Sequence, residues 1–151
     1  MTDIAATELI HAQVPLCATL GITADTFTAD EVVLSLDWAP NLCTGNDVLH
    51  GGIVMALADS AGGLCAFLNL PAGAGGTATI ESKTNFLRPL TRRAGTARER
   101  SGQSGTATRS GTLKAHCHPL HIGKRVIVLE TEVRNDDGKL AAKVLQTQAI
   151  L

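Results

Sequence analysis

The chain has 151 residues, of which 44% are hydrophobic and 18% charged, and this is enough apolar material for the core of one domain. Its net charge is −1 and only 3% of its residues are aromatic, which argues against a nucleic-acid-binding surface built on cations or stacking rings. The first residues carry Asp3 and Glu8 and no basic start, so we expect no signal peptide, and no apolar run approaches the ~20 residues of a membrane span.

The four cysteines are scattered along the chain, and no two of them form a C-x-x-C pair. A disulfide framework or a structural zinc site would space its cysteines differently. We therefore expect reduced, mostly buried thiols in a cytoplasmic protein. They are Cys17, Cys43, Cys65 and Cys117.

The amino-terminal part predicts short helices followed by a strand. Residues 4–20 have a helical spacing that Pro15 interrupts, so we assign residues 1–24 to a short helical segment. Residues 31–38 alternate between apolar and polar side chains, which is the pattern of a half-buried strand. Residues 39–49 contain Pro, Asn, Asp and Gly and predict a loop.

Residues 51–69 form the strongest predicted helix. Asp59 is the only ionisable residue between His50 and Asn69, and a helix that is apolar almost all round is expected to be buried. The apolar positions recur at spacings of three and four residues: Ile53, Leu57, Ala61, Leu64 and Leu68.

The remainder predicts four strands, at residues 77–87, 113–120, 125–134 and 140–150. The Asp-Gly dipeptide in the turn at 135–138 tolerates the positive φ that a hairpin between the last two strands requires. The order is therefore one strand, a buried helix and four more strands. We predict an α+β fold in which an antiparallel sheet wraps around one central helix.

Residues 94–112 interrupt this pattern. They include four Gly, three Ser and four Thr, and no Val, Ile, Leu or Phe, so they cannot build a core. We predict a flexible inserted loop, and an ordinary long loop is the alternative. Apart from this loop, we expect residues 1–151 to form a single domain.

The start of the predicted helix, His50-Gly51-Gly52, has features of a site that stabilises negative charge. The first N–H groups of a helix lack internal acceptors and lie at the positive end of its dipole. Glycines let a ligand approach that backbone, so the position suits a carbonyl oxygen that gains charge during acyl transfer. The alternative is a glycine-rich loop that simply precedes a helix.

Asp59 lies on a strip of small residues of the same helix. At about 100° per residue it shares one face with Gly52, Ala56 and Gly63, about 120° from the apolar stripe. Gly62 and Gly63 each cost about 1 kcal/mol relative to Ala, so we expect a backbone or a ligand close beside them. Asp59 is therefore a candidate reactive carboxylate, and the alternative is an Asp that caps a loop or pairs with an Arg.

Six short motifs occur in order: LHGG at 49–52, AD at 58–59, TIE at 79–81, NFLRP at 85–89, GKR at 123–125 and DGK at 137–139. Together they resemble the motifs of hotdog-fold acyl-CoA thioesterases, most closely the PaaI-like, phenylacetate-degradation subgroup. The resemblance covers about residues 30–151 apart from the insertion. It implies the hotdog fold, with its sheet wrapped around one long central helix.

The resemblance also implies roles for individual residues. Asp59 matches the family's catalytic carboxylate, which acts as nucleophile or as general base on water. Gly51 matches the residue whose backbone N–H polarises the thioester carbonyl, and His50 matches the motif histidine that orients the loop. Thr79 falls near a position where a hydroxyl positions water or substrate. The site is shared across a homodimer, and such dimers usually pair into a homotetramer.

Substrate contacts are expected around the same motifs. The family commonly has Asn or Gln six residues before the motif histidine, where this chain has Thr44, with Asn46 nearby. Basic side chains at the ends of strands suit the phosphates of coenzyme A, although a solvated charged edge is the alternative. The predicted substrate-binding residues are Gly52, Thr44, Asn46, Asn85, Arg88, Lys124 and Arg125.

Three histidines lie in, or just after, the second of the four later strands and require a separate assessment. His116 and His118 share one face of a strand, and His121 follows, so a metal clamp is geometrically possible. No second cluster of ligands accompanies them, and surface histidines are the default interpretation. We predict neither a metal site nor a cofactor.

We therefore expect an acyl-CoA thioesterase that hydrolyses an acyl- or aryl-CoA thioester to the free acid and CoA. Two other classes use the same fold. A non-catalytic acyl-CoA-binding module is favoured by Thr44 in place of Asn or Gln. A dehydratase or hydratase needs an acid and a base at a β-hydroxyl, which His50 and Asp59 suit less well than they suit hydrolysis.

Overall fold

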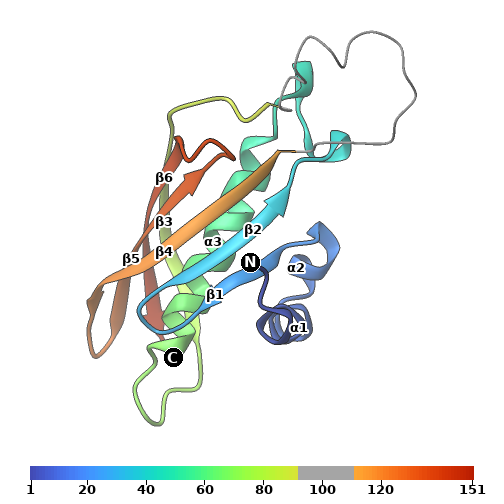
Figure 1. Cartoon of the computed structure of the whole chain (residues 1–151). Helices are drawn as coiled ribbons and strands as arrows, with labels where there is room; N and C mark the ends of the chain where they lie inside the picture. Colours follow the sequence, from blue (N-terminus) through green and yellow to red (C-terminus); the bar gives the residue numbers. More distant parts are fainter. Residues whose placement is uncertain (92–110) are drawn as a thin grey trace, which may run out of the picture.

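A six-stranded antiparallel sheet carries one long helix, α3 (Gly51–Leu68), across one face (Figure 1). The computed structural model describes residues 1–91 and 111–151. The strands lie in the order β1-β2-β4-β5-β6-β3, so β3 is an edge strand and pairs only with β6. Their bounds are β1 Thr23–Phe27, β2 Val32–Asp37, β3 Thr77–Phe86, β4 Thr112–Ile122, β5 Val126–Arg134 and β6 Leu140–Ile150. The predicted α+β hotdog architecture is confirmed.

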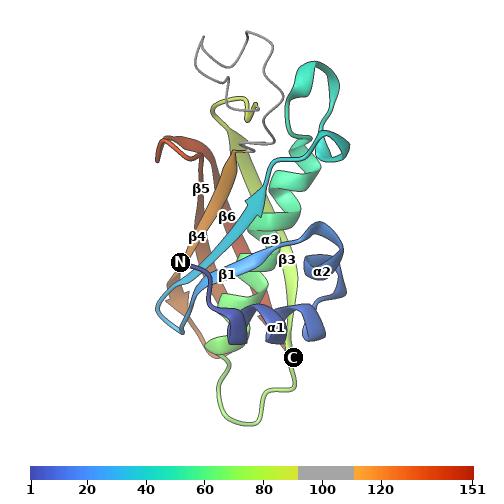
Figure 2. The ribbon, with the colours of Figure 1, turned by 45° about the vertical axis from the view of Figure 1, so that its right-hand side comes forward.

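The amino-terminal segment folds into two short helices beside α3 and β1 (Figure 2). These are α1 (Ile4–Gln13) and α2 (Pro15–Leu20), and they are separated at Pro15, as predicted. Pro15 fits the first turn of α2 because its missing N–H would have no intrahelical acceptor there. Helix α2 ends at Gly21, whose φ of +69° is accessible to glycine at little cost.

Strand β1 lies partly within the segment that was predicted to be helical, so that boundary was wrong. The sequence of β1 has no apolar alternation, and Ala24 is its one fully buried residue among the described positions. The strand forms because it pairs with β2, where Ala24 lies opposite Leu34. Hydrogen-bonded pairing with β2, and not the local sequence, therefore makes this segment a strand.

The cysteine prediction agrees with the structure. Cys17, Cys65 and Cys117 are buried, Cys43 is partly buried, and all four are free thiols. Burial raises the pKa of the Cys17 thiol. A hydrogen bond with Cys65, together with burial, raises the pKa of Cys117.

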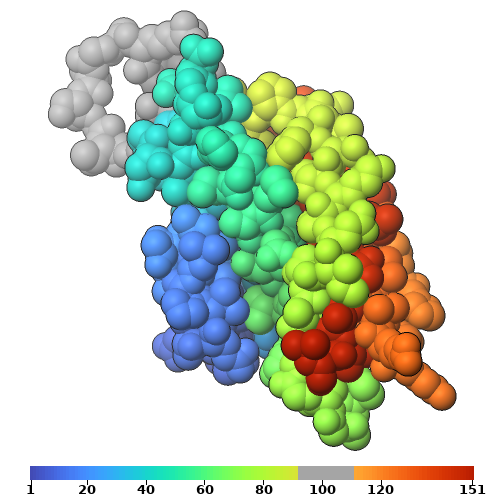
Figure 3. Space-filling view, turned by 180° about the vertical axis from the view of Figure 1, so that it is seen from behind, coloured from blue at the N-terminus to red at the C-terminus, as the bar shows by residue number. Residues whose placement is uncertain are grey.

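Helix α3 is buried on one side only. Val54, Leu57 and Ala61 pack toward the sheet, whereas Met55 and Phe67 are 40% and 45% exposed. Figure 3 shows α3 at the surface between the amino-terminal helices and β3. The prediction of a buried helix therefore holds only for the side of α3 that faces the sheet. No other described element of the chain covers the opposite side of the helix.

By length and composition alone, α3 would be apolar enough to cross a membrane, contrary to the expectation that no segment approaches this limit. Its contacts with β2, β3, β4, β5 and β6 identify it as the core helix of this fold.

The predicted insertion at 94–112 lies outside the described residues except at its carboxyl-terminal end. There the predicted boundary was wrong, because Thr112 is the first residue of β4. Its backbone N–H donates to Asp136 Oδ1 and its hydroxyl to Asp37 Oδ1, both at 2.7 Å. The Gly111 carbonyl accepts the N–H of Trp38 at 2.7 Å. These hydrogen bonds thus attach Gly111 and Thr112 to the folded domain.

Candidate active site

The amino terminus of α3 presents one unpaired N–H group. His50 is the N-cap, and its Nδ1 accepts the Gly52 N–H at 2.9 Å. The N–H groups of Ile53 and Val54 donate to the His50 carbonyl. Among the described residues the Gly51 N–H has no acceptor, so it is available to a ligand oxygen at the positive end of the helix dipole. Because Nδ1 accepts, the neutral His50 ring carries its proton on Nε2.

The two glycines at this helix start are close to aromatic rings of their own chain. A Cβ on Gly51 would lie 3.1 Å from Cζ of Phe86, and a Cβ on Gly52 would lie 3.0 Å from Nδ1 of His50. Glycine at position 51 therefore lets Phe86 lie over the helix terminus. At position 52 it leaves room for the histidine cap.

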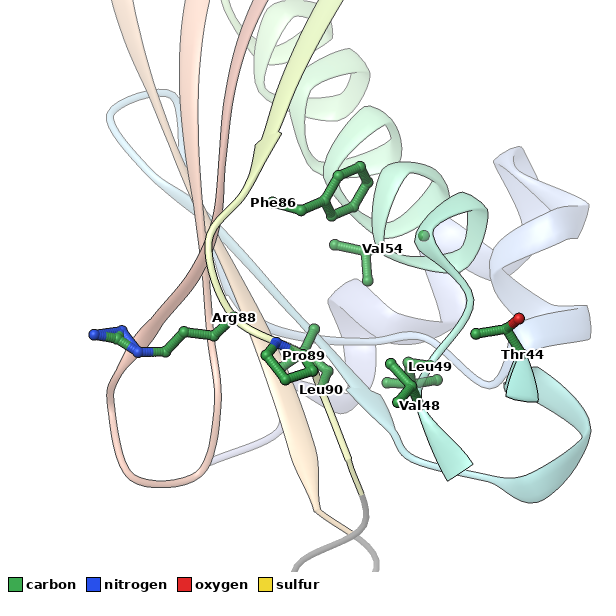
Figure 4. A pocket seen from close by; sticks show the side chains of 9 residues that line it. Thr44, Val48, Leu49, Val54, Phe86, Arg88, Pro89 and Leu90 are labelled. Carbon is green, nitrogen blue, oxygen red and sulfur yellow. The ribbon is translucent and has the colours of Figure 1, made fainter. Parts of the chain in front are cut away.

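A cavity of about 360 Å³ opens beside Gly51 (Figure 4). Thr44 lies at one side of it, and the Phe86 ring points toward α3. The rest of its lining is mainly apolar and comes from the loop before α3, from α3 and from the chain after β3: Val48, Leu49, Val54, Pro89 and Leu90.

Asp59 is exposed on the uncovered face of α3, and one of its two oxygens is held by two donors. The Thr79 hydroxyl donates to Asp59 Oδ1 at 3.0 Å. The side-chain amide of Gln146 donates to the same oxygen. Oδ2 has no partner among the described residues. The carboxylate is thus held through one oxygen, and the other is available to a ligand.

The direction of the Thr79 hydrogen bond follows from its neighbours. The Thr79 oxygen accepts from the amide nitrogens of Gln146, at 3.2 Å, and Gln148, at 2.8 Å. With both lone pairs engaged, its proton points to Asp59. The series of hydrogen bonds continues to Thr77, whose hydroxyl donates to Gln148 Oε1 at 3.0 Å. These five side chains form one directional network that ends on the carboxylate.

Asp59 and Thr79 line a second cavity, of about 610 Å³, between α3, the start of β3 and the amino-terminal helices. Asp59 is the only charged residue among the described residues that line it. Its apolar wall is built by Val14, Leu16, Ala56, Leu64 and Phe67. The cavity therefore offers one carboxylate in mainly apolar surroundings.

The two halves of the predicted site lie far apart along one helix. Gly51 and Asp59 are eight residues apart, which corresponds to about 12 Å at about 1.5 Å per residue. A single thioester carbonyl cannot contact the Gly51 N–H and the Asp59 carboxylate of the same chain across that distance.

For three further predicted substrate-binding residues, the structure shows other local contacts or backbone roles. Asn46 is exposed with a φ of +60°, so its local role is to adopt a left-handed backbone, which Asn tolerates. Asn85 pairs with Lys143 on the outer face of the sheet, opposite to the face that holds Phe86. Arg88 lines the cavity beside Gly51, but its guanidinium donates to the carbonyl of Leu140 at 3.3 Å and is directed outward (Figure 4).

Lys124 and Arg125 are exposed at the turn between β4 and β5. The Arg125 carbonyl accepts the N–H of Ile150 at 2.9 Å, and Ile150 lies opposite Thr77 at the start of β3. This turn therefore lies at the end of the sheet where β3 begins, whereas Phe86 and Gly51 lie at the other end.

The predicted strand histidines face an acidic neighbour. His116 Nδ1 and His118 Nε2 lie 3.5 and 3.7 Å from Glu31 Oε1. Within residues 1–91 and 111–151, no group of three or more His, Cys, Asp or Glu side chains could hold a metal ion.

Gln146 and Gln148, the two amides of the Asp59 network, were not predicted from the sequence. Both are buried, with exposed fractions of 0% and 1%. A signal was present in the alternation of β6. Gln146 and Gln148 continue the inward-facing register in which Ala142 and Val144 are buried apolar residues. Polar residues in the inward-facing register of a strand require partners, and here these include Asp59 and Thr79.

The sequence profile of the thioesterase superfamily matches residues 46–96. The chain is also 33% identical over 119 residues to SSO2140 of Saccharolobus solfataricus, which is named as a candidate esterase, covering 79% of this chain and 71% of that protein. The chain belongs to the thioesterase superfamily. It is a thioester hydrolase, as predicted.

Further relatives agree with this membership. The 1,4-dihydroxy-2-naphthoyl-CoA hydrolase of Escherichia coli is 28% identical over 104 residues, covering 69% of this chain and 62% of that protein. A thioesterase-family structure from Silicibacter pomeroyi has a TM-score of 0.77 at 25% identity, covering 96% and 95% of the two chains. The E. coli PaaI structure shares the fold, with a TM-score of 0.76 at 19% identity and coverage of 95% and 89%.

Proposed function

We propose that this thioesterase hydrolyses acyl-CoA or aryl-CoA thioesters to the free acid and CoA, with Asp59 as the reacting carboxylate. The observation that carries the proposal is the geometry of Asp59: Oδ1 accepts two hydrogen bonds, Oδ2 has no partner among the described residues, and the side chain lines a cavity. Attack by Oδ2 on the thioester carbon would break the C–S bond, form an anhydride and release the CoA thiolate, and water would then hydrolyse the anhydride to the free acid and restore the Asp59 carboxylate. Removal of a proton from a water molecule by Oδ2 would reach the same products without a covalent intermediate.

Gly51 supplies the electrophilic half of the proposed site. Its free N–H lies at a helix amino terminus, where a carbonyl oxygen that gains negative charge is stabilised. His50 keeps the terminus open by capping Gly52 and leaving the Gly51 N–H unpaired. Thr44 lines the cavity beside Gly51, and Gly52 follows Gly51 in the chain, so we propose that both contact the thioester group.

The separation of about 12 Å between Gly51 and Asp59 supports a site shared by two copies of the chain. A second copy placed on the exposed face of α3 would bring its own Gly51 toward Asp59 and cover Met55 and Phe67. Pairing of β3 with its copy would extend the sheet, because the outer edge of β3 has no strand partner among the described residues. We propose a homodimer that pairs into a homotetramer, in the cytoplasm.

The lining of both cavities favours apolar acyl or aryl groups. Outside Asp59, the cavity between α3 and the amino-terminal helices has no charged lining residue among the described positions, so a charged acyl group would lose its hydration there. Lys124 and Arg125 are the proposed contacts for the CoA phosphates, because both are exposed cations.

The test is a thiol-release assay over a panel of aliphatic and aromatic acyl-CoA esters, with the wild-type protein and with Asp59→Asn. The substitution keeps the shape of the side chain and removes its charge, so kcat should fall by at least about 10²-fold while KM changes little. Glu8→Gln, at an exposed position on α1, is the matched control and should retain activity.

Near-wild-type turnover by Asp59→Asn would exclude Asp59 from the mechanism. Binding of acyl-CoA by the wild-type protein without thiol release would favour the non-catalytic binding module.

A further inference from the structure

Gln146 is a buried amide on the inward face of β6, between the apolar Val144 and a second buried amide, Gln148. It is 0% exposed and shares the inward register of β6 with Ala142 and Val144. Burial of an amide without hydrogen bonds is unfavourable, so an apolar residue would be the simpler choice at this position. Its contacts explain why an amide stands here.

The Gln146 side chain reaches from β6 to the reactive carboxylate. Its nitrogen donates to Asp59 Oδ1 and to the Thr79 hydroxyl oxygen. An ionised carboxylate only accepts hydrogen bonds, so the amide nitrogen, and not the oxygen, must face Asp59. The amide oxygen then faces α3, where it is buried without a partner among the described residues. The side chain satisfies Asp59 while its own acceptor stays unpaired.

Gly62 explains how this side chain passes α3. A Cβ on Gly62 would overlap Oε1 of Gln146 and lie 2.8 Å from its Cδ. A glycine within a helix is less favourable than alanine, so a glycine here needs a reason, and the Gln146 amide supplies one. The neighbouring Gly63 meets nothing within 4 Å, so the close approach is specific to position 62.

We propose that Gln146 is a positioning residue for hydrolysis: it holds Oδ1 of Asp59 so that Oδ2 faces the substrate, and Gly62 provides the space for it. This role rests on the proposed function of Asp59. Thr79 alone would leave the carboxylate free to rotate about its single remaining hydrogen bond. The second donor fixes the plane of the carboxylate.

The first test is Gln146→Met in the full-length protein. Methionine keeps the length of the side chain and removes both the donor to Asp59 and the unpaired oxygen. We expect kcat to fall about tenfold or more, the scale of one hydrogen bond to a charged group, with KM nearly unchanged and Tm unchanged or raised. A kcat within about twofold of wild type, or a loss of kcat accompanied by a lower Tm, would overturn the proposal.

The second test uses the contact between Gln146 and Gly62 and measures Tm in addition to kcat. Gly62→Ala should lower both Tm and kcat in the wild-type background, because the new Cβ displaces the amide. In a Gln146→Ala background the space is empty, so Gly62→Ala should raise Tm and leave kcat where it was. Additive effects of the two substitutions would overturn the role of Gly62.

These measurements separate the two proposals. A wild-type protein that releases no thiol from any ester overturns the proposed function and the role of Gln146 with it. An active wild-type protein whose Gln146→Met variant has normal kcat overturns only the role of Gln146.

Discussion

The Thr79 hydroxyl donates to Asp59 across 20 residues of sequence, and two buried amides set the direction of this hydrogen bond. Gln146 and Gln148 occupy the lone pairs of the hydroxyl, so its proton is directed to the carboxylate. Because all of these hydrogen bonds lie within the protein, the carboxylate is oriented before any ligand binds.

Removal of the Thr79 hydroxyl should impair turnover without unfolding the protein. Thr79→Val keeps the branched shape and removes the donor, so we expect kcat to fall about tenfold with little change in KM. Thr79→Ser retains a hydroxyl and should preserve most of kcat. Steady-state kinetics of both variants, with Tm as a check on folding, would decide; equal losses in the two variants would argue against a role for the hydroxyl.

The Gly51 N–H can be removed with little change to the helix. Proline is tolerated at the first helical position, and the ψ of His50, 133°, suits the residue before a proline. Gly51→Pro should lower kcat by about 10²-fold or more, as expected for loss of one donor to the developing oxyanion. Gly51→Ala keeps the N–H and controls for the contact of a new Cβ with Phe86. Similar kcat values for the two variants would show that the N–H contributes nothing.

A site shared between two chains should allow complementation. Homodimers of Gly51→Pro and of Asp59→Asn should each be inactive, because every site lacks one group. After co-expression or subunit exchange, mixed dimers contain one intact site, so activity should return to about a quarter of the wild-type level. No recovery in a mixture in which mixed dimers have been demonstrated would mean that both groups act within one chain or not at all.

The exposed cations at the turn between β4 and β5 should affect CoA esters selectively. Replacement of Lys124 and Arg125 by Ala should raise KM for an acyl-CoA and leave KM unchanged for the same acyl group on a short thiol without the nucleotide. The reason is that only the CoA ester carries phosphates for these side chains to pair with. Lys139→Ala, at another exposed turn position, is the matched control. Equal KM changes for both esters would assign the turn another role.

The ion pair on the outer face of the sheet predicts a pH dependence of stability. Burial alone would raise the pKa of Asp25, but hydrogen bonds from Lys114, at 2.5 Å, and from Ser35 hold it below the ordinary value of 3.8. A lowered folded-state pKa stabilises the protein above pH 3.8, and this contribution is lost as the pH falls through the lowered pKa. Lys114→Met should therefore reduce the free energy of unfolding by about 1 kcal/mol at neutral pH, since Lys114 is 43% exposed.

Denaturant titrations over a range of pH values would test this expectation. The difference between wild type and Lys114→Met should shrink as the solution is acidified, while Lys139→Met should match wild type throughout. A difference that is independent of pH would mean that Lys114 contributes through packing and not through its charge.

Local patterns explain why the main elements and part of the candidate site could be predicted. The helix at Gly51–Leu68 follows from apolar spacing over five turns, and its start follows from a histidine cap and two glycines. The hairpin between β5 and β6 follows from Asp-Gly, with Gly138 at a φ of +72°. Strand β1 could not be predicted in this way, because its pairing with β2, and not its own composition, makes it a strand.

The sequence by itself therefore determined most of the elements, the core helix and the two candidate positions, Gly51 and Asp59, because a helix repeat and a turn depend on neighbouring residues. The tertiary structure decided what surrounds them. Pairing of β6 with β3, and the register shift between Thr79 and Glu81, bring Gln146, Gln148 and Thr79 together beside Asp59. No sequence periodicity relates residues 59, 79 and 146, since only strand order and register place them in contact.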